Sequence, residues 1–171
     1  MGYVRAYEEG DAEALAPRLR VADMQEIQAG YGQEIEVSLR EGAERSAPSC
    51  TIIGNSGAVA GMFGIVAEGD YGRVWLLGSD ELVSGAMRRQ FIRETRNHLR
   101  VLCRPYKTVG NFIDRRNVVH MRWLRHLDFS FTGRTRLGIE GHPFVEFEQC
   151  VCQQHQQVDR PVQPVEQLQE Q

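Results

Sequence analysis

The sequence predicts one mixed α/β domain, with a twisted sheet of about six or seven strands, antiparallel and then parallel, flanked by helices. Strand-like alternation and helix-like spacing of apolar residues follow one another along the chain, separated by glycine-bearing turns. In 171 residues, 42% hydrophobic content is enough to bury a core without disulfide or metal support. After Gln149 the chain is rich in glutamine and has no aromatic residue. We therefore expect a domain over residues 1–149 and a tail, residues 150–171, that is flexible or bound to a partner.

The N-terminal part of the chain predicts a strand followed by two helical regions. Tyr3–Tyr7 alternates and is rich in strand formers. A helical pattern starts at Asp11, which can cap it, and Pro17 is expected to break that helix in two. A further helix is predicted over residues 33–45, where the apolar stripe is narrow.

Three consecutive antiparallel strands are predicted next. Cys50–Ile53 and Val59–Ala67 flank a turn at residues 55–57, Asn-Ser-Gly, which is the pattern of a β-hairpin. A second glycine-bearing turn, residues 68–72, leads into a strand at Arg73–Leu77.

A long helix is predicted over residues 84–104, with Ser84 as a possible cap. One face of this helix is apolar: Met87, Phe91, Thr95, Leu99 and Leu102. Another face carries a continuous stripe of arginines: Arg89, Arg93, Arg96, Arg100 and Arg104. Such a stripe is either a solvated face or a docking edge for an acidic partner or a phosphate backbone.

The last part of the domain predicts a strand, a helix and two further strands. Lys107–Ile113 forms the strand, and a helix of about three turns follows Asn117, whose side chain can cap it. Phe129–Thr132 and Phe144–Glu148 are the last two strands, joined by a turn region at residues 133–142.

The helix after Asn117 resembles the fourth helix of the Gcn5-related N-acetyltransferase (GNAT) fold. There, an asparagine near the helix start is followed by a small residue, a Leu-Tyr pair, and a Gly-Phe pair that opens the next strand. The matching positions here are Asn117, His120, Trp123, Leu124, Leu127, Asp128 and Phe129. The preceding order of a strand, a helix pair and an antiparallel meander also fits this fold. The resemblance implies a GNAT-like domain.

The cofactor loop of that family is not retained. Its pattern, Gln/Arg-x-x-Gly-x-Gly/Ala, holds the pyrophosphate of acetyl-CoA on backbone amides at a helix N-terminus. Aligned on Gly85, the pattern places Leu82 where glutamine or arginine is expected. Asp80 and Glu81 add two carboxylates close to the expected position of the pyrophosphate, and like charges weaken binding.

The general acid of the family is also missing. The tyrosine that protonates the departing thiolate falls on Leu124, which cannot donate a proton. His120 and His126 lie nearby, although a histidine on a helix surface is more often a bystander. The Cys150-x-Cys152 pair lacks the usual zinc-knuckle spacing. We therefore assign no catalytic, cofactor-binding or metal-binding residue, and we expect no cofactor.

Two segments carry a narrower resemblance, to internal virion proteins of short-tailed bacteriophages that contain a degenerate GNAT-like domain. They are WLLGSDEL at Trp75–Leu82 and GNFIDRRNVVHMRWLRHLDF at Gly110–Phe129. The resemblance covers Tyr3 to Phe147. It implies a non-catalytic structural or assembly protein of the particle interior, needed for the internal core and genome delivery and present in the host cytoplasm during assembly. It also implies an oligomer within the particle and other virion proteins as partners, contacted in our interpretation through the tail, residues 150–171, and the arginine stripe.

Two alternatives stay open. The chain could be an active N-acyltransferase that uses acetyl-CoA with an atypical cofactor loop. It could also bind phage DNA through the arginine stripe, which a sequence pI of about 6.0 disfavours. No apolar run reaches the roughly 20 residues of a membrane span, so we expect no membrane partner.

Overall fold

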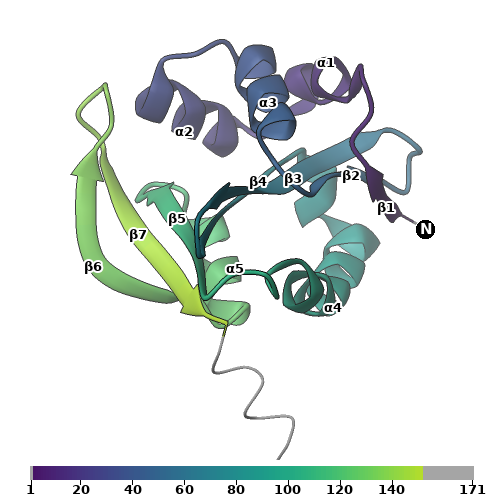
Figure 1. The fold of residues 1–171 in the computed structure, drawn as a ribbon. Helices are drawn as coiled ribbons and strands as arrows, with labels where there is room; N and C mark the ends of the chain where they lie inside the picture. The colour runs from purple at the N-terminus through teal and green to yellow at the C-terminus, as the bar shows by residue number, and fades with distance from the viewer. Residues whose placement is uncertain (1, 152–171) are drawn as a thin grey trace, which may run out of the picture.

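A computed structural model describes residues 2–151, which form a seven-stranded mixed sheet in the order β1-β2-β3-β4-β5-β7-β6. The strands are β1 (Tyr3–Ala6), β2 (Ser49–Ile53), β3 (Val59–Glu68), β4 (Tyr71–Gly78), β5 (Thr108–Asp114), β6 (Ser130–Leu137) and β7 (Pro143–Cys150). The α-helices are α1 (Asp11–Leu15), α2 (Val21–Tyr31), α3 (Ile35–Glu44), α4 (Gly85–Leu102) and α5 (Val118–His126), with short 3-10 turns η1 (Ala16–Arg18) and η2 (Asp80–Val83). Helices α1 to α3 cover one face of the sheet and α4 and α5 the other (Figure 1). The predicted fold class is confirmed.

The first helical layer follows the predicted break. Pro17 lies in η1, which separates α1 from α2, because proline has no N–H for an α-helical hydrogen bond. Asp11 does not cap its helix as expected. Its buried carboxylate instead accepts hydrogen bonds from Arg5 in β1, at 2.6 Å, and from Thr51 in β2, at 2.7 Å. Asp11 therefore fastens α1 to the edge of the sheet.

Strands β2 to β4 form the predicted antiparallel meander, β1 pairs antiparallel with β2, and the sheet then changes direction. Strand β5 runs parallel to β4, but their pairing covers only three positions, from Tyr71↔Thr108 to Arg73↔Gly110. Strand β7 pairs antiparallel with β5, and β6 pairs antiparallel with β7. A Cβ at Gly110 would lie 2.3 Å from the carbonyl oxygen of Phe147, so glycine is required where β5 meets β7.

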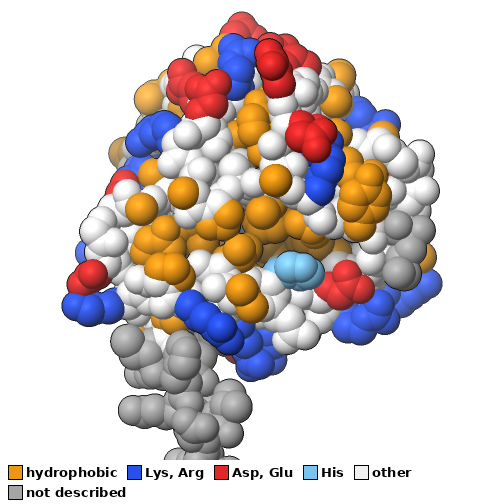
Figure 2. Space-filling view, turned by 45° about the vertical axis from the view of Figure 1, so that its right-hand side comes forward, with side chains coloured by type: hydrophobic (Ala, Val, Ile, Leu, Met, Phe, Trp, Pro, Cys, Tyr) orange, Lys and Arg blue, Asp and Glu red, His pale blue; other side chains and the backbone are white. Residues whose placement is uncertain are grey.

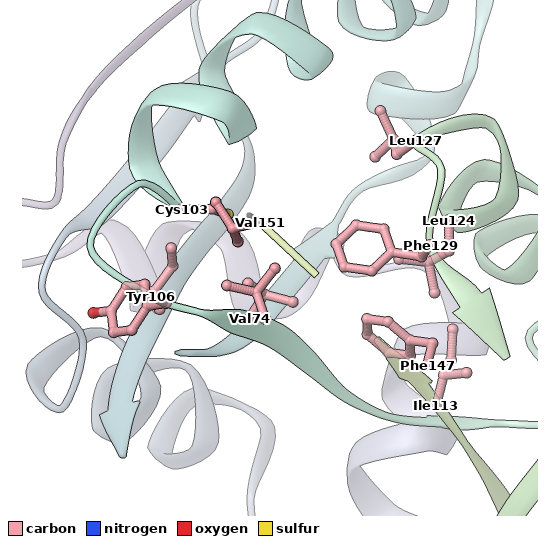
Figure 3. Packing of buried hydrophobic residues seen from close by; sticks show 11 residues of the cluster. Val74, Cys103, Tyr106, Ile113, Leu124, Leu127, Phe129, Phe147 and Val151 are labelled. Carbon is pink, nitrogen blue, oxygen red and sulfur yellow. The ribbon is translucent and has the colours of Figure 1, made fainter. Parts of the chain in front are cut away.

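The largest hydrophobic cluster lies between the sheet and the layer of α4 and α5, where buried residues of β4, β5, β7 and α5 meet (Figure 3). The ring of Phe147 packs edge-on against Phe129, with centroids 5.3 Å apart, and lies 6.4 Å from the ring of Phe131. Ile113 and Leu124 complete the wall around these rings.

Two boundaries differ from the sequence prediction. Strand β6 does not stop at Thr132 but continues to Leu137 past a register shift opposite β7, so the turn is confined to residues 138–142. Val151 is buried in the cluster of Figure 3, and its N–H donates to the carbonyl of Lys107 at 2.9 Å. The packed domain therefore reaches Val151, beyond the predicted end at residue 149. The rest of the predicted tail, residues 152–171, lies outside the described residues. None of the helices in residues 2–151 is long and apolar enough to cross a membrane.

We predict that Phe147→Ala lowers the free energy of unfolding by about 3–5 kcal/mol, because it leaves a cavity beside Phe129 and Phe131. The matched control is Leu137→Ala in β6, whose side chain is 72% exposed and whose loss should cost less than about 0.5 kcal/mol. Urea denaturation followed by circular dichroism measures both. Equal effects of the two substitutions would contradict the assignment of the core.

Candidate functional site

The candidate site lies where β4 and β5 move apart. Beyond Arg73 and Gly110 the two strands no longer pair, and the side-chain amide of Asn111 donates to the carbonyl of Val74 at 2.9 Å. A cavity of about 280 Å³, lined mainly by apolar side chains of β4, β5, α2, α4 and α5, occupies this region. The space-filling view shows a hollow walled by hydrophobic side chains (Figure 2). A gap in a sheet with helices on both faces gives a ligand access to the interior.

The wide end of the gap is closed by hydrogen bonds to Asp23 of α2. Its fully buried carboxylate accepts two hydrogen bonds from Arg20, at 2.6 and 3.1 Å. It also accepts the backbone N–H of Gly78 at the end of β4, at 3.0 Å, and the side-chain N–H of Asn117 after β5, at 3.0 Å. Asp23 thus connects a helix on one face of the sheet to the start of α5 on the other. The Oδ1 of Asn117 accepts the His120 N–H, so the predicted cap is confirmed.

Glu26 lies one helical turn after Asp23 and lines the cavity. Burial raises the pKa of the Glu26 carboxyl to about 8, and the nearby Asp23 and Asp114 carboxylates add to the rise. The Asn117 side-chain N–H, which donates to Glu26 Oε2 at 2.9 Å, acts in the opposite direction, as does Arg20. Glu26 therefore titrates close to neutral pH, which suits a group that exchanges protons with a ligand.

His120 and Trp123 line the same cavity from α5. His120 is buried, and burial lowers its pKa to about 4, so the ring is neutral at physiological pH. Within residues 2–151, the Nδ1 of His120 and the Nε1 of Trp123 are buried and have no hydrogen-bond partner. A buried polar atom without a partner costs about 1–3 kcal/mol, which favours a polar ligand or water beside these rings.

Asp23, Glu26 and His120 each place a ligand atom within 4.8 Å of the other two, a spacing that could hold a metal ion. The hydrogen bonds of Asp23 argue against one. Its two oxygens already accept four hydrogen bonds, two of them from the Arg20 guanidinium. A cation would have to lie beside this positive charge and displace the Asn117 amide, so the donor set does not fit a metal site.

The segment expected to hold a cofactor forms the 3-10 turn η2 instead of a glycine-rich loop. Glu81 is directed away from the start of α4, because its carboxylate accepts the Ser56 N–H at 3.0 Å and the Ser56 hydroxyl at 2.7 Å. The carboxylate of Glu81 is therefore engaged by Ser56, whereas Asp80 is exposed; that these two residues oppose a pyrophosphate stays a prediction. Leu82 is buried against Ile52 and Met87.

The N-terminus of α4 still offers hydrogen-bond donors. Ser84 stands at the predicted cap position, but its hydroxyl donates to the carbonyl of Glu81 and caps nothing. Within the described chain, the backbone N–H groups of Gly85, Ala86 and Met87 donate to no acceptor. Free amides at the start of an 18-residue helix favour an anion.

The arginine stripe lies on α4 as predicted, except that Arg104 follows the end of the helix. Arg89, Arg93, Arg100 and Arg104 are exposed. Arg96 is partly buried, donates to the His126 carbonyl at 2.5 Å and pairs with Asp128 at 3.2 Å. Whether this stripe binds a partner remains a prediction.

Sequence reasoning missed Glu26 and Asp23. The only signal in the sequence was a pair of acidic residues three positions apart beside Met24 and Ile27, which a solvated helix edge would also show. It did find Asn117 and His120, but it took His120 for a surface residue, whereas the ring is 9% exposed. Leu124 is 3% exposed and belongs to the core, and its side chain has no proton to donate as a general acid.

We predict that Asn117→Ala lowers the free energy of unfolding by about 1–3 kcal/mol, because α5 loses its cap and the bond to Asp23 through the sheet is broken. Asn117→Asp should cost more, since it brings a third carboxylate to Asp23 and Glu26. Asn97→Ala, at an exposed position of α4, is the control. Chemical denaturation at neutral pH tests all three; destabilisation by Asn97→Ala as large as by Asn117→Ala would argue against the role of Asn117.

We predict that the stability of Glu26→Gln relative to wild type increases with pH. The folded-state pKa of Glu26, about 8, lies above its ordinary value of 4.5, so ionisation of Glu26 destabilises the fold progressively as pH rises from about 5 to 8. Glutamine is not ionised. Melting temperatures of both proteins at pH 5 and pH 8.5 should therefore separate by a few degrees only at the higher pH, and a constant difference would exclude the raised pKa.

No protein-family model and no curated protein matches this sequence. Solved structures do match its fold. An N-acetyltransferase from Staphylococcus aureus is 14% identical, with a TM-score of 0.65 over 88% of this chain and 99% of that chain. A GNAT-family acetyltransferase from Streptococcus pneumoniae is 14% identical, with a TM-score of 0.57 over 88% and 99%. A spermidine N-acetyltransferase from Vibrio cholerae, in complex with CoA and spermine, is 10% identical, with a TM-score of 0.62 over 88% and 96%. At these identities the likeness concerns the fold: the chain has the fold of GNAT acetyltransferases.

Proposed function

We propose that this domain transfers an acyl group from a CoA thioester to an amine, with Glu26 as the proton acceptor. The observation that carries the proposal is Glu26 itself, a carboxyl with a pKa of about 8 that faces a cavity at the gap between β4 and β5. A general base is most effective when its pKa lies near the working pH.

The gap supplies groups that suit a thioester. The carbonyl of Val74 points toward β5, and the alternation of a strand places the peptide group of Leu76 on the same edge. No β5 residue pairs with Leu76, because the described pairing ends at Arg73. Its N–H could therefore donate to the acyl oxygen, whose negative charge grows when an amine attacks. The free amides of Gly85, Ala86 and Met87 fit the diphosphate of the acyl donor.

The reaction needs two proton movements. Glu26 accepts the proton that an ammonium group must lose before its nitrogen can attack the thioester carbon. The C–N bond then forms, the C–S bond breaks, and the thiolate receives the proton that the new amide nitrogen gives up. The proton held by Glu26 then passes to solvent, which restores the carboxylate for the next turnover; with a pKa of about 8, Glu26 releases it readily near neutral pH.

The test is titration calorimetry with acetyl-CoA at low salt, followed by a thiol-release assay with a panel of amines. We expect binding by wild type and by Glu26→Gln, and a loss of turnover in Glu26→Gln of at least about 100-fold, as for removal of a general base. An Asn97→Ala variant should behave as wild type. Absence of acetyl-CoA binding, or turnover that survives in Glu26→Gln, would refute the proposal.

A second candidate is a non-catalytic role in phage virion assembly, through contacts with other virion proteins. It is supported by the sequence resemblance, by Leu124 at the position of the general acid, and by the exposed arginines of α4. If acetyl-CoA does not bind, this role becomes the leading one, and the protein should then be found in constant copy number in purified particles.

A further inference from the structure

A second cavity, of about 170 Å³, adjoins the first on the face of the sheet that carries α2. The two share Arg73, Asn111 and Phe112 in their walls, so these side chains lie between or beside both cavities at the start of the gap. The turn between β6 and β7 closes this side, because the Glu140 N–H donates to the carbonyl of Ala29 in α2. Figure 1 shows the tip of this hairpin beside α2. An acceptor could therefore reach Glu26 along this second cavity.

Arg136 of β6 stands in the wall of the second cavity. Its guanidinium lies over the ring of Phe112, 4.6 Å from the centroid, and 5.9 Å from that of Phe144. It also donates to the hydroxyl of Tyr31 at 3.4 Å. Stacking on one ring and bonding to a hydroxyl hold the side chain in place and leave its charge uncompensated.

The other charges of the second cavity are already paired. Glu68 pairs with Arg73. Glu146 is buried and accepts a hydrogen bond from the Nε of Arg134 at 2.6 Å. Among the residues that the structure describes, Arg136 forms no ion pair with a carboxylate. The charged residues of the cavity wall are two glutamates and two arginines, and Arg136 is the arginine left without a carboxylate partner in the described part of the chain, so it can pair with an anionic group of a ligand.

We propose that the amine acceptor also carries a carboxylate, and that Arg136 binds this carboxylate while Glu26 receives the proton of the amine. A planar guanidinium held by stacking pairs with a carboxylate through two parallel hydrogen bonds. Tyr31, the partner of Arg136, lies five residues after Glu26 on α2, an axial distance of about 7.5 Å. This separation favours an acceptor whose amine and carboxylate are several bonds apart. The inference rests on the proposed acyl transfer.

The experiment compares acceptors that differ only in the carboxylate: 6-aminohexanoate against hexylamine, and 4-aminobutanoate against butylamine. With acetyl-CoA and the full chain, we expect kcat/KM for 6-aminohexanoate to exceed that for hexylamine by about 10- to 100-fold, mainly through KM. Arg136→Gln should abolish the preference, so that kcat/KM for 6-aminohexanoate no longer exceeds that for hexylamine measured with the same variant. Arg136→Lys, which keeps the charge without the planar fork, should retain part of it.

The matched control is Arg125→Gln. Arg125 also stacks on a phenylalanine, 4.8 Å from the ring of Phe131, but that ring packs in the cluster beneath the opposite face of the sheet. Arg125→Gln should keep the full preference for the acceptor with a carboxylate. Thermal melts will show whether each variant is folded. If wild type acetylates both members of a pair equally well, or if Arg125→Gln loses the preference as Arg136→Gln does, the inference is wrong although acyl transfer stands. If no amine is acetylated, the proposed function fails, and this inference fails with it.

Discussion

The hydrogen bond from Asn117 to Asp23, made through the gap between β4 and β5, is the contact on which the rest of the site depends. Two strands that move apart leave peptide groups without partners, and buried peptide groups must be paired. Near the narrow end of the gap, the side chain of Asn111 donates a hydrogen bond to the carbonyl of Val74. At the wide end, the carboxylate of Asp23 accepts a hydrogen bond from the N–H of Gly78. Polar side chains thus replace part of a missing ladder, and the sheet can stay open without losing cohesion.

These hydrogen bonds also show which polar residues of the site are structural and which remain available to a ligand. Asp23 is saturated by four donors and has a structural task. Glu26 has one hydrogen bond, from Asn117, and His120 Nδ1 has none within the described chain. The groups that remain available to a ligand are therefore those whose hydrogen-bonding capacity the fold leaves unused. Because Asn117 contacts both carboxylates, the position of α5 and the proton affinity of Glu26 are linked.

The scaffold could be predicted from the sequence because it depends on local patterns. The alternation of apolar and polar residues predicted the strands, and Pro17 predicted the break between the first helices. The spacing of apolar residues after Asn117 predicted the capped helix. The site could not be predicted from the sequence, because its contacts join distant segments. Asn117 lies 94 residues from its partner Asp23, and the carboxylate of Glu81 accepts a hydrogen bond from Ser56, 25 residues earlier. Arg136 was hidden by the register shift in β6, which made a strand look like a turn.

The region that would hold the acyl donor fits acyl transfer less well than the region that would hold the amine acceptor. On the donor side, Leu82 fills the core and its N–H donates to the carbonyl of Ser79, and the first turn of α4 offers amides that suit phosphates. That is a weaker anion site than a glycine-rich loop, since fewer amides converge on it. On the acceptor side, Glu26, Tyr31 and Arg136 form a polar path that the core does not require. Of these groups Glu26 is the one that costs stability, because burial disfavours its charged form, whereas the guanidinium of Arg136 is exposed to water. Under the proposed function, a ligand that exchanges a proton with Glu26 would account for this cost.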